Sequence, residues 1–226
     1  VYIYNGKTVK ALIDLKDIPI TFDGILECNI ENSLAAAASL YALGVKADSI
    51  REGLATFYPD INSNPGRFNI FDMGDFKVML DYSHNPAGYR EVARFIEKLS
   101  AKRFVGVIGM PGDRTDSSIT EAARICGNYF EKIYIKEDND LRGRAPGEVA
   151  GIFYDVVFKN GAGKENVEII YSEVKALEKA VLDAEPGDFI VMFYEEFEPS
   201  IELLNKLKEE LNKNTIAPDM IIQNVG

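Results

Sequence analysis

Residues 81–86, Asp-Tyr-Ser-His-Asn-Pro, combine a carboxylate with two ring side chains, one of them the single histidine of the chain. They follow an apolar stretch typical of a strand and precede a helical pattern. A carboxylate at such a strand end can accept hydrogen bonds from ribose hydroxyls, and a tyrosine or histidine ring can lie flat against a purine. The candidate nucleotide contacts here are Asp81, Tyr82, His84 and Asn85. An Asn-Pro pair is also a common helix start, which explains those two residues without a ligand.

Three residues in the earlier part of the chain also suit a nucleotide. Arg67 follows a turn at residues 64–66, and a guanidinium at such a junction matches phosphate oxygens in pairs. An ordinary surface arginine before a strand is equally compatible with this pattern. Asn29 and Asn32 lie at an expected helix start, where an amide can pair with an adenine edge but is also a frequent N-cap.

Two loops beyond later strands carry the remaining candidates. Residues 109–116 form a glycine-rich connection whose backbone N–H groups can face an anion, although its spacing is not GxGxxG. Residues 136–144 alternate in charge, so an arginine could hold the carboxylate of an amino acid while an aspartate holds its amine. A solvated charged loop is the commoner explanation of such a stretch. The candidate amino-acid contacts are Gly112, Asp113, Arg114, Asp138, Arg142 and Arg144.

Several other chemistries are disfavoured by the sequence. Residues 161–164, Gly-Ala-Gly-Lys, resemble half a phosphate loop, but Phe158 and Glu165 replace its first glycine and its hydroxyl residue, so we interpret them as a turn. A single histidine excludes a two-histidine metal centre. Cys28 and Cys126 have no companion for a zinc site or a disulfide framework, which predicts a reducing, cytoplasmic location.

The composition narrows the class of protein. The 226 residues are 46% hydrophobic and 27% charged, which suits one or two globular domains with a core. The net charge of −11 and the lack of a Lys/Arg cluster disfavour a nucleic-acid partner, whereas a single nucleotide needs only a few donors. No apolar run reaches the roughly 20 residues of a membrane span, so we expect no membrane partner. The composition is compatible with a homo-oligomer and with a monomer.

The elements that must position these residues change in character at residues 58–66, which are rich in turn formers. Before this linker we expect a hairpin over residues 1–13, a helix over 34–43 that stops at Gly44, and a helix over 49–57 capped by Asp48. After it, strands rich in Val, Ile and Phe alternate with helices. The expected strands are residues 68–71, 76–82, 103–110, 132–138, 167–171 and 188–194. The expected helices are residues 85–99, 117–130, 147–159, 172–184 and 197–213.

This alternation predicts an α/β fold: a doubly wound, Rossmann-like domain with a mostly parallel sheet, preceded by a small α+β segment. Ligands of such sheets bind beyond the carboxyl ends of the strands. The rule points to residues 81–86, 109–116, 136–144 and 194–198 as the places to look for a site.

Taken in order, these motifs resemble the later part of enzymes of the Mur ligase family. The segment NIENSLAAAASLYALGV is similar to the Asn-rich helix late in the family's central ATP-binding domain. NPGRFNIF is similar to its interdomain Pro-Gly-Arg, and LDYSHNPAGYREV to the Asp-Tyr-Ala-His-Asn-Pro segment of its C-terminal domain. The resemblance implies a remnant of the central domain in residues 1–64 and the C-terminal domain in residues 65–226. Within the family, GDRTD and KEDNDLRGRAPGEV resemble the arginine-adding ligase module of cyanophycin synthetases.

The resemblance implies an ATP-dependent ligase that phosphorylates a carboxylate and lets an amine attack the acyl phosphate. The substrates implied are arginine and a poly-aspartate backbone. By this resemblance, the residues expected to contact ATP are Asn29 and Asn32 at the adenine, Arg67 at the distal phosphates, and Asp81 and His84 at the ribose and base. The loops at residues 112–114 and 138–144 would face the incoming amino acid. Enzymes of this kind close the C-terminal domain over ATP bound to the central domain.

One departure from the family pattern limits this expectation. Family members carry GxxGK[ST], magnesium-holding acids and a central lysine upstream of the position of Asn29, and none of these occurs here. We therefore expect a fragment with no catalytic residue or metal ligand of its own, inactive without the rest of the ligase, which would bind Mg and most of the ATP. One alternative is a UDP-muramyl peptide amino-acid ligase, disfavoured because Asp-Asn-Pro-Arg is absent. Another is a non-catalytic nucleotide-binding or assembly module.

Overall fold

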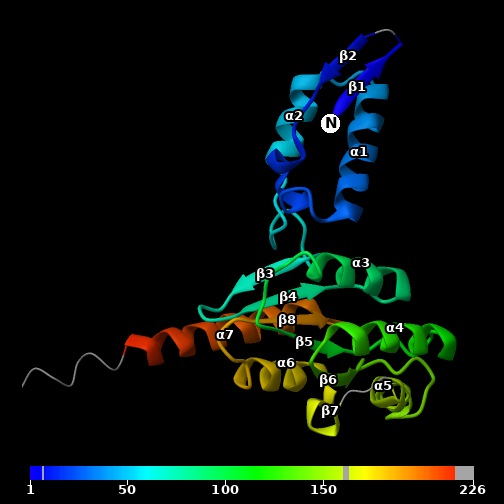
Figure 1. Cartoon of the computed structure of the whole chain (residues 1–226), viewed down its shortest axis with the longest axis vertical. Helices are drawn as coiled ribbons and strands as arrows, with labels where there is room; N and C mark the ends of the chain where they lie inside the picture. Colours follow the sequence, from blue (N-terminus) through cyan, green and yellow to red (C-terminus); the bar gives the residue numbers. More distant parts are fainter. Residues whose placement is uncertain (7, 160–162, 217–226) are drawn as a thin grey trace, which may run out of the picture. The chain divides into compact units, whose positions relative to one another are not determined.

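The computed structural model describes residues 1–6, 8–159 and 163–216. By internal packing the chain divides into two units (Figure 1). The first unit comprises Val1–Asn69 and Arg90–Ser100, and the second comprises Ile70–Tyr89 and the described part of Ala101–Gly226. The assignment of domains to residues 1–64 and 65–226 stays a prediction.

The first unit contains a hairpin and two helices. Strands β1 (Tyr2–Asn5) and β2 (Thr8–Ala11) pair antiparallel, and short 3-10 helices at Leu15–Asp17 and Pro19–Thr21 lead to α1 (Glu27–Ala42) and α2 (Ala47–Ala55). Buried Leu12, Ala37 and Ile50 form a small core in which residues of the hairpin, α1 and α2 meet. The predicted hairpin and both helices are therefore present.

The starts of the two helices differ from the sequence prediction. Helix α1 begins at Glu27 because the ladder of hydrogen bonds already includes Ile30 N to Leu26 O, at 3.1 Å, so Asn29 lies in the first turn and is not the N-cap. Helix α2 begins at Ala47 with Lys46 as its N-cap residue, so the prediction of Asp48 as the cap was wrong. Asp48 instead pairs with Arg51 one turn along the helix, at 2.8 Å.

The C-terminal end of α1 agrees with the sequence prediction. Gly44 has a positive φ of 83°, a conformation that glycine adopts without strain. The N–H of Val45 donates to Leu40 O at 3.0 Å, which satisfies one of the last carbonyls of the helix. Gly44 therefore ends α1 as expected.

A mostly parallel sheet forms the centre of the second unit. Its strands are β3 (Asn69–Asp72), β4 (Lys77–Asp81), β5 (Arg103–Ile108), β6 (Lys132–Glu137), β7 (Val167–Ser172) and β8 (Asp188–Phe193). Their order in the sheet is β3-β4-β8-β5-β6-β7, and the neighbouring pairs from β4 to β7 are parallel. The predicted fold class is confirmed, since consecutive parallel strands are joined by helices.

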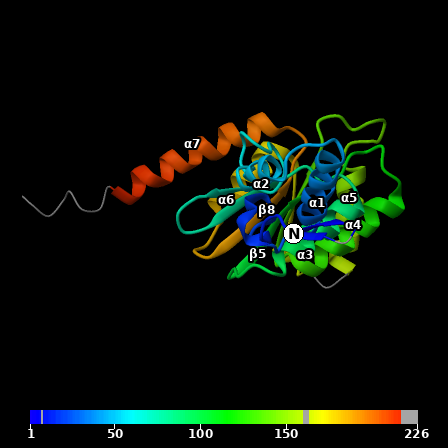
Figure 2. The ribbon, with the colours of Figure 1, turned by 90° about the horizontal axis from the view of Figure 1, so that it is seen from above.

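The helices that follow β4 along the chain are α3 (Pro86–Ile96), which belongs to the first unit from Arg90 on, and, in the second unit, α4 (Asp116–Tyr129), α5 (Glu148–Lys159), α6 (Glu173–Leu182) and α7 (Phe197–Ile216). Helices α6 and α7 pack on the face of the sheet that carries Val105 and Val107. The alternate residue Gly106 points to the other face, where an added Cβ would meet the ring of Phe130 after α4 at 2.7 Å. The two layers of helices can be followed in Figure 2. None of the helices described is long and apolar enough to cross a membrane.

The segment that looks like a phosphate loop is only partly described. Gly161 and Ala162 lie outside the described residues, and Lys164 begins a 3-10 helix, Lys164–Asn166, directly before β7. A phosphate loop instead runs from a strand into a helix.

Candidate functional site

A pocket lies at the carboxyl edge of the parallel sheet in the second unit. Neighbouring strands β4, β8, β5 and β6 all end at this edge, so the residues that follow them come together. The pocket is lined by Tyr82, Ser83, His84, Gly109, Pro111, Lys136, Asp138, Arg142, Phe193, Tyr194 and Glu195. Each of the four segments that the sequence singled out at this edge contributes lining residues.

The loop after β4 is shaped by Asp81 and Asn85. Asp81 is buried, and its Oδ1 accepts hydrogen bonds from the backbone N–H of Ser83, at 2.9 Å, and from the Ser83 hydroxyl. Asn85 Oδ1 accepts from Gly88 N at 2.9 Å, and Pro86 is the first residue of α3. The interpretation of Asn85 and Pro86 as a helix start is therefore confirmed.

Aromatic side chains form one wall of the pocket. The ring of Tyr82 lies 5.3 Å from that of His84 and 5.4 Å from that of Tyr194, measured between centroids. The ring of Phe197 continues the row, 5.2 Å from Tyr194. Tyr82 is 37% exposed, and His84 Nδ1 lies 3.1 Å from Tyr82 O. The wall thus offers ring surfaces to a planar ligand.

Arg144 joins the loops that follow β5 and β6. Its Nε donates to Gly112 O and its Nη2 to Arg114 O, both at 2.7 Å. The same side chain forms ion pairs with Asp116, at 2.7 Å, and with Glu148, at 2.6 Å. All three guanidinium nitrogens are thus engaged within the protein, so the arrangement makes Arg144 a support of these loops.

Arg142 and Arg114 lie closer to the pocket. Arg142 Nη1 lies 3.1 Å from Asp113 Oδ2, and this hydrogen bond holds the pKa of Asp113 below its ordinary value. Arg114 Nε donates to His84 O at 3.1 Å, which connects the loop after β5 to the loop after β4. The structure therefore brings Asp113, Arg114 and Arg142 together beside the candidate nucleotide residues of the same unit.

Two charged side chains at the floor of the pocket are almost completely buried. The side chains of Lys136 and Asp138 are 1% and 5% exposed, and their Nζ and Oδ1 atoms lie 2.7 Å apart. The interpretation of residues 136–144 as a solvated loop is therefore wrong for these two residues. A sequence signal existed, since the period of two in β6 places Lys136 on the same face as buried Tyr134.

Glu195 is a further acidic group of the pocket, to which the sequence assigned no role. Its carboxylate accepts hydrogen bonds from Asn139 N at 2.5 Å and Asp140 N at 3.5 Å. Burial raises the pKa of Glu195, and the nearby Asp138 carboxylate adds to the rise. The loops after β6 and β8 are thus hydrogen-bonded to each other.

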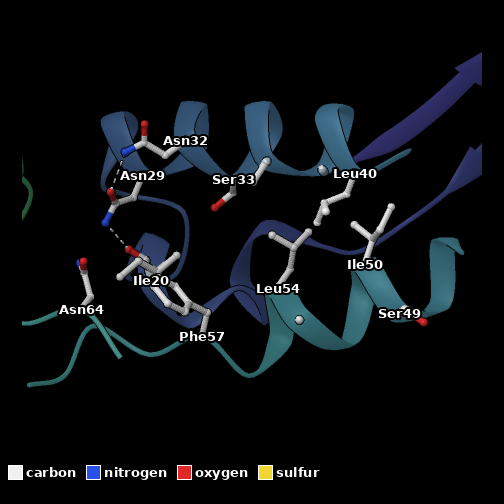
Figure 3. A pocket seen from close by; sticks show the side chains of 13 residues that line it. Ile20, Asn29, Asn32, Ser33, Leu40, Ser49, Ile50, Leu54, Phe57 and Asn64 are labelled. Atoms are coloured by element: carbon white, nitrogen blue, oxygen red, sulfur yellow. Dashed lines mark hydrogen bonds between the residues drawn. The ribbon is translucent and has the colours of Figure 1, made fainter. Parts of the chain in front are cut away.

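Two candidate residues of the first unit, Asn29 and Asn32, line a groove between α1 and α2 (Figure 3). The groove has a volume of about 400 Å³ and mostly apolar walls that include Leu40, Leu54 and Phe57. Asn29 and Asn32 lie at one end. Asn29 is buried and donates from Nδ2 to Ile20 O at 2.9 Å, while Asn32 Nδ2 donates to Asn29 Oδ1 at 3.2 Å.

Arg67 is exposed on a turn of the same unit and does not line this groove. Buried Asn69 holds the turn, because its Oδ1 accepts from Gly66 N at 2.6 Å and its Nδ2 donates to Asn64 O at 3.0 Å. The sequence analysis gave Asn69 no role, because its position indicates only the second residue of the expected strand 68–71. Arg67 and the two asparagines belong to the first unit, and the other candidate residues belong to the second.

Comparisons with known proteins agree with this architecture. The family model described as "Mur ligase, glutamate ligase domain" matches residues 66–193. The chain is 38% identical to the cyanophycin synthetase of Synechocystis sp. over 92% of this chain and 24% of that protein. It is 35% identical to the cyanophycin synthetase of Crocosphaera subtropica over 90% of this chain and 23% of that protein. The chain thus spans about a quarter of the length of these relatives.

Solved structures show the same fold. The UDP-N-acetylmuramate-alanine ligase of Thermotoga maritima superposes with a TM-score of 0.60 at 15% identity, over 82% of this chain and 38% of that one. FolC of E. coli in complex with ADP superposes with a TM-score of 0.57 at 22% identity, over 81% of this chain and 39% of that one. Since the family model covers more than half of the sequence, the chain belongs to the Mur ligase family.

Proposed function

We propose that this chain is the C-terminal portion of an ATP-dependent ligase that joins an amino acid to a carboxylate through an acyl phosphate, as in a cyanophycin synthetase. The observation that carries the proposal is the small pocket at the carboxyl ends of parallel strands, which is lined by aromatic rings, by the Arg142 guanidinium and by the carboxylates of Asp138 and Glu195. Its support is the identity of 35% and 38% to cyanophycin synthetases over nine tenths of the chain.

The aromatic wall is the proposed nucleotide contact of the second unit. Tyr82 and His84 offer faces for a purine. The ribose hydroxyls are assigned to Asp81 by the resemblance and by its place at the end of β4, although its side chain is buried and accepts from Ser83. Asn85 acts through the loop, because its side chain caps α3.

In the first unit, the exposed side chain of Asn32 is the better candidate for the adenine edge. The amide of its partner Asn29 is already committed to Ile20 O and to Asn32. Arg67, exposed on its turn, is the proposed contact of the distal phosphates. Both assignments follow from the resemblance and from the chemistry of the side chains.

The amino-acid substrate proposed for the adjoining loops is arginine, added to a poly-aspartate backbone. Arg142 and Arg114 are suited to its α-carboxylate, and Asp113 to its amine. Glu195, beside the rings of Tyr82 and Tyr194, is suited to a guanidinium, which favours both a carboxylate and an aromatic face.

We further propose that the remaining part of the ligase supplies the phosphate loop and the Mg²⁺ ligands, and that the enzyme works in the cytoplasm. The 226-residue polypeptide contains no GxxxxGK[ST] sequence. On this proposal it does not turn over ATP by itself, and enzyme-like ATP hydrolysis that survives repurification would contradict it.

Calorimetric titration of the purified chain with ATP and, separately, with L-arginine tests the site. Tyr82→Ala and His84→Ala should each weaken ATP binding by about tenfold, since stacking of a base on a ring contributes roughly 1–3 kcal/mol. The matched control is Tyr171→Ala, an exposed aromatic side chain on β7 that does not line the pocket. Equal ATP affinity in all three variants would contradict the nucleotide assignment. Binding of meso-diaminopimelate in preference to L-arginine would favour the muramyl peptide ligase.

A further inference from the structure

The ammonium group of Lys136 lies at the centre of a buried network below the pocket. The residue is the penultimate one of β6, and its side chain is 1% exposed. Its Nζ lies 2.7 Å from Asp138 Oδ1 and 2.5 Å from Glu173 Oε2, on the first residue of α6. Burial by itself works to lower the pKa of Lys136, but the two carboxylates outweigh it and raise the pKa. Lys136 therefore stays charged at the floor of the pocket.

The neighbouring strand β5 leaves room for this side chain. A Cβ added at Gly109, directly after β5, would lie 2.6 Å from Lys136 O and 3.0 Å from both Lys136 Cδ and Cε. Those distances are too short for any residue other than glycine. The Lys136 side chain thus lies against the end of β5, the strand that separates β6 from β8 in the sheet.

Glu173 binds both Lys136 and the loop after β8. Its Oε2 accepts from Glu195 N at 2.7 Å and its Oε1 from Glu196 N at 2.9 Å. Glu195 and Glu196 in turn bind the loop after β6, because their carboxylates accept from Asn139 N at 2.5 Å and from Asn139 Nδ2 at 3.0 Å. The contacts close a ring from Lys136 through Glu173 to the second loop and back to the first.

We propose that Lys136 is a positioning residue, which holds the loops at residues 138–140 and 194–196 together across the end of β5 and thereby fixes the shape of the amino-acid subsite. It touches no substrate and acts through Asp138 and Glu173. The proposed consequence for substrate binding rests on the function proposed above, whereas the role in holding the loops does not.

Amide hydrogen exchange on the whole chain, resolved by NMR, tests the loop connection. In Lys136→Met the amides of Asn139, Glu195 and Glu196 should exchange about tenfold faster or more. The amides of Gly147 and Ala150 donate to the neighbouring residue Glu137 at 2.8 and 3.1 Å, outside the network, and report any acceleration that comes from the lower unfolding free energy of the whole variant. The tenfold difference is therefore expected relative to these two amides, whereas a purely structural role would accelerate exchange equally in both groups.

Two further variants keep this test decisive. Lys132→Met is the matched control, since Lys132 begins the same strand but donates to Glu165 O, at 2.9 Å, outside the network. Glu173→Gln removes one charge with little change of shape and takes the place of Lys136→Met if that variant does not fold. It should give the same exchange pattern.

The binding readout separates the subsite from the nucleotide contacts. We expect Lys136→Met to raise the Kd for L-arginine by about tenfold or more and to change the Kd for ATP by less than about twofold. Unchanged exchange at Asn139, Glu195 and Glu196, or equal weakening of both ligands, would overturn the positioning role. If the unaltered chain binds no arginine, the proposed function fails, and the exchange pattern alone decides whether Lys136 holds the loops.

Discussion

Replacing Lys136 by methionine removes one charge and keeps most of the volume of the side chain. The change leaves the carboxylates of Asp138 and Glu173, whose side chains are 5% and 4% exposed, without their shared cation. Removing one partner of a buried ion pair costs about 3–5 kcal/mol, because the other charge stays buried. We expect Lys136→Met to lose about 3 kcal/mol or more of unfolding free energy at pH 8, a large part of the 5–15 kcal/mol of an ordinary domain.

The loss should depend on pH with a definite sign. Without Lys136, two negative charges lie buried with no cation, and binding of a proton to either carboxylate relieves both the burial of charge and the mutual repulsion in the folded variant. A proton that the folded state binds more tightly than the unfolded state gives stability at low pH, which is lost as the pH rises. In the unaltered chain the raised pKa of Lys136 keeps the pair intact across this range. The destabilisation should therefore be smaller at pH 5 than at pH 8, by about 1 kcal/mol or more.

Urea unfolding followed by circular dichroism at both pH values measures the difference. Lys132→Met should cost less than about 1 kcal/mol at either pH, because Lys132 is only half-buried and makes a single hydrogen bond to a backbone carbonyl. A loss below about 1 kcal/mol for Lys136→Met, equal at the two pH values, would show that water reaches the two carboxylates and that Lys136 does not hold a buried ion pair.

Three other substitutions have defined outcomes. Gly109→Ala should destabilise the chain by about 1–3 kcal/mol, since its Cβ would meet the backbone of the next strand. Gly151→Ala, in α5 with nothing within 4 Å of the new Cβ, should instead stabilise the chain by about 0.5–1 kcal/mol. Urea unfolding that ranks the two variants the other way would contradict the close approach of Gly109 to Lys136. Glu195→Gln removes a carboxyl group whose pKa is raised above its ordinary value of 4.5. The unaltered chain should therefore lose unfolding free energy relative to the variant as the pH rises above 4.5. A difference between the two that is constant or grows with pH would exclude a raised pKa. Asn69→Ala should cost about 1–3 kcal/mol in thermal or urea unfolding, because Gly66 N and nearby carbonyls lose a buried partner; a cost near zero would mean that water replaces the amide.

The sequence predicted the second unit well because the central strands of its sheet are buried on both faces, which gives continuous apolar runs, while its helices bury one face each. Strands such as β5, Arg103–Ile108, follow directly from short apolar runs between turns, and the parallel order follows from the helices between them. The edge that collects the candidate residues could then be named without coordinates. The helix starts in the first unit were misplaced, since α1 begins about two turns before its alanine-rich stretch and Asp48 pairs with Arg51 instead of capping α2.

The buried network was beyond sequence reasoning for a physical reason. A run of alternating charges such as residues 136–144 is solvated in most proteins, and burial is stable only where partners from other elements satisfy every charge. Here those partners are Glu173 on α6 and the backbone after β8, both distant in the sequence from Lys136. A local sequence pattern cannot show that such distant residues contact one another. It indicates only that Lys136 lies on the same face of β6 as Tyr134.

Backbone amide chemical shifts during titration with ATP and L-arginine show whether the carboxyl edge of the parallel sheet binds both ligands. We expect arginine to shift the resonances of residues 138–142 and 194–196, and ATP to shift those of residues 82–84, all at this edge. Shifts confined to the opposite ends of the strands, or no shifts at millimolar ligand, would contradict this expectation.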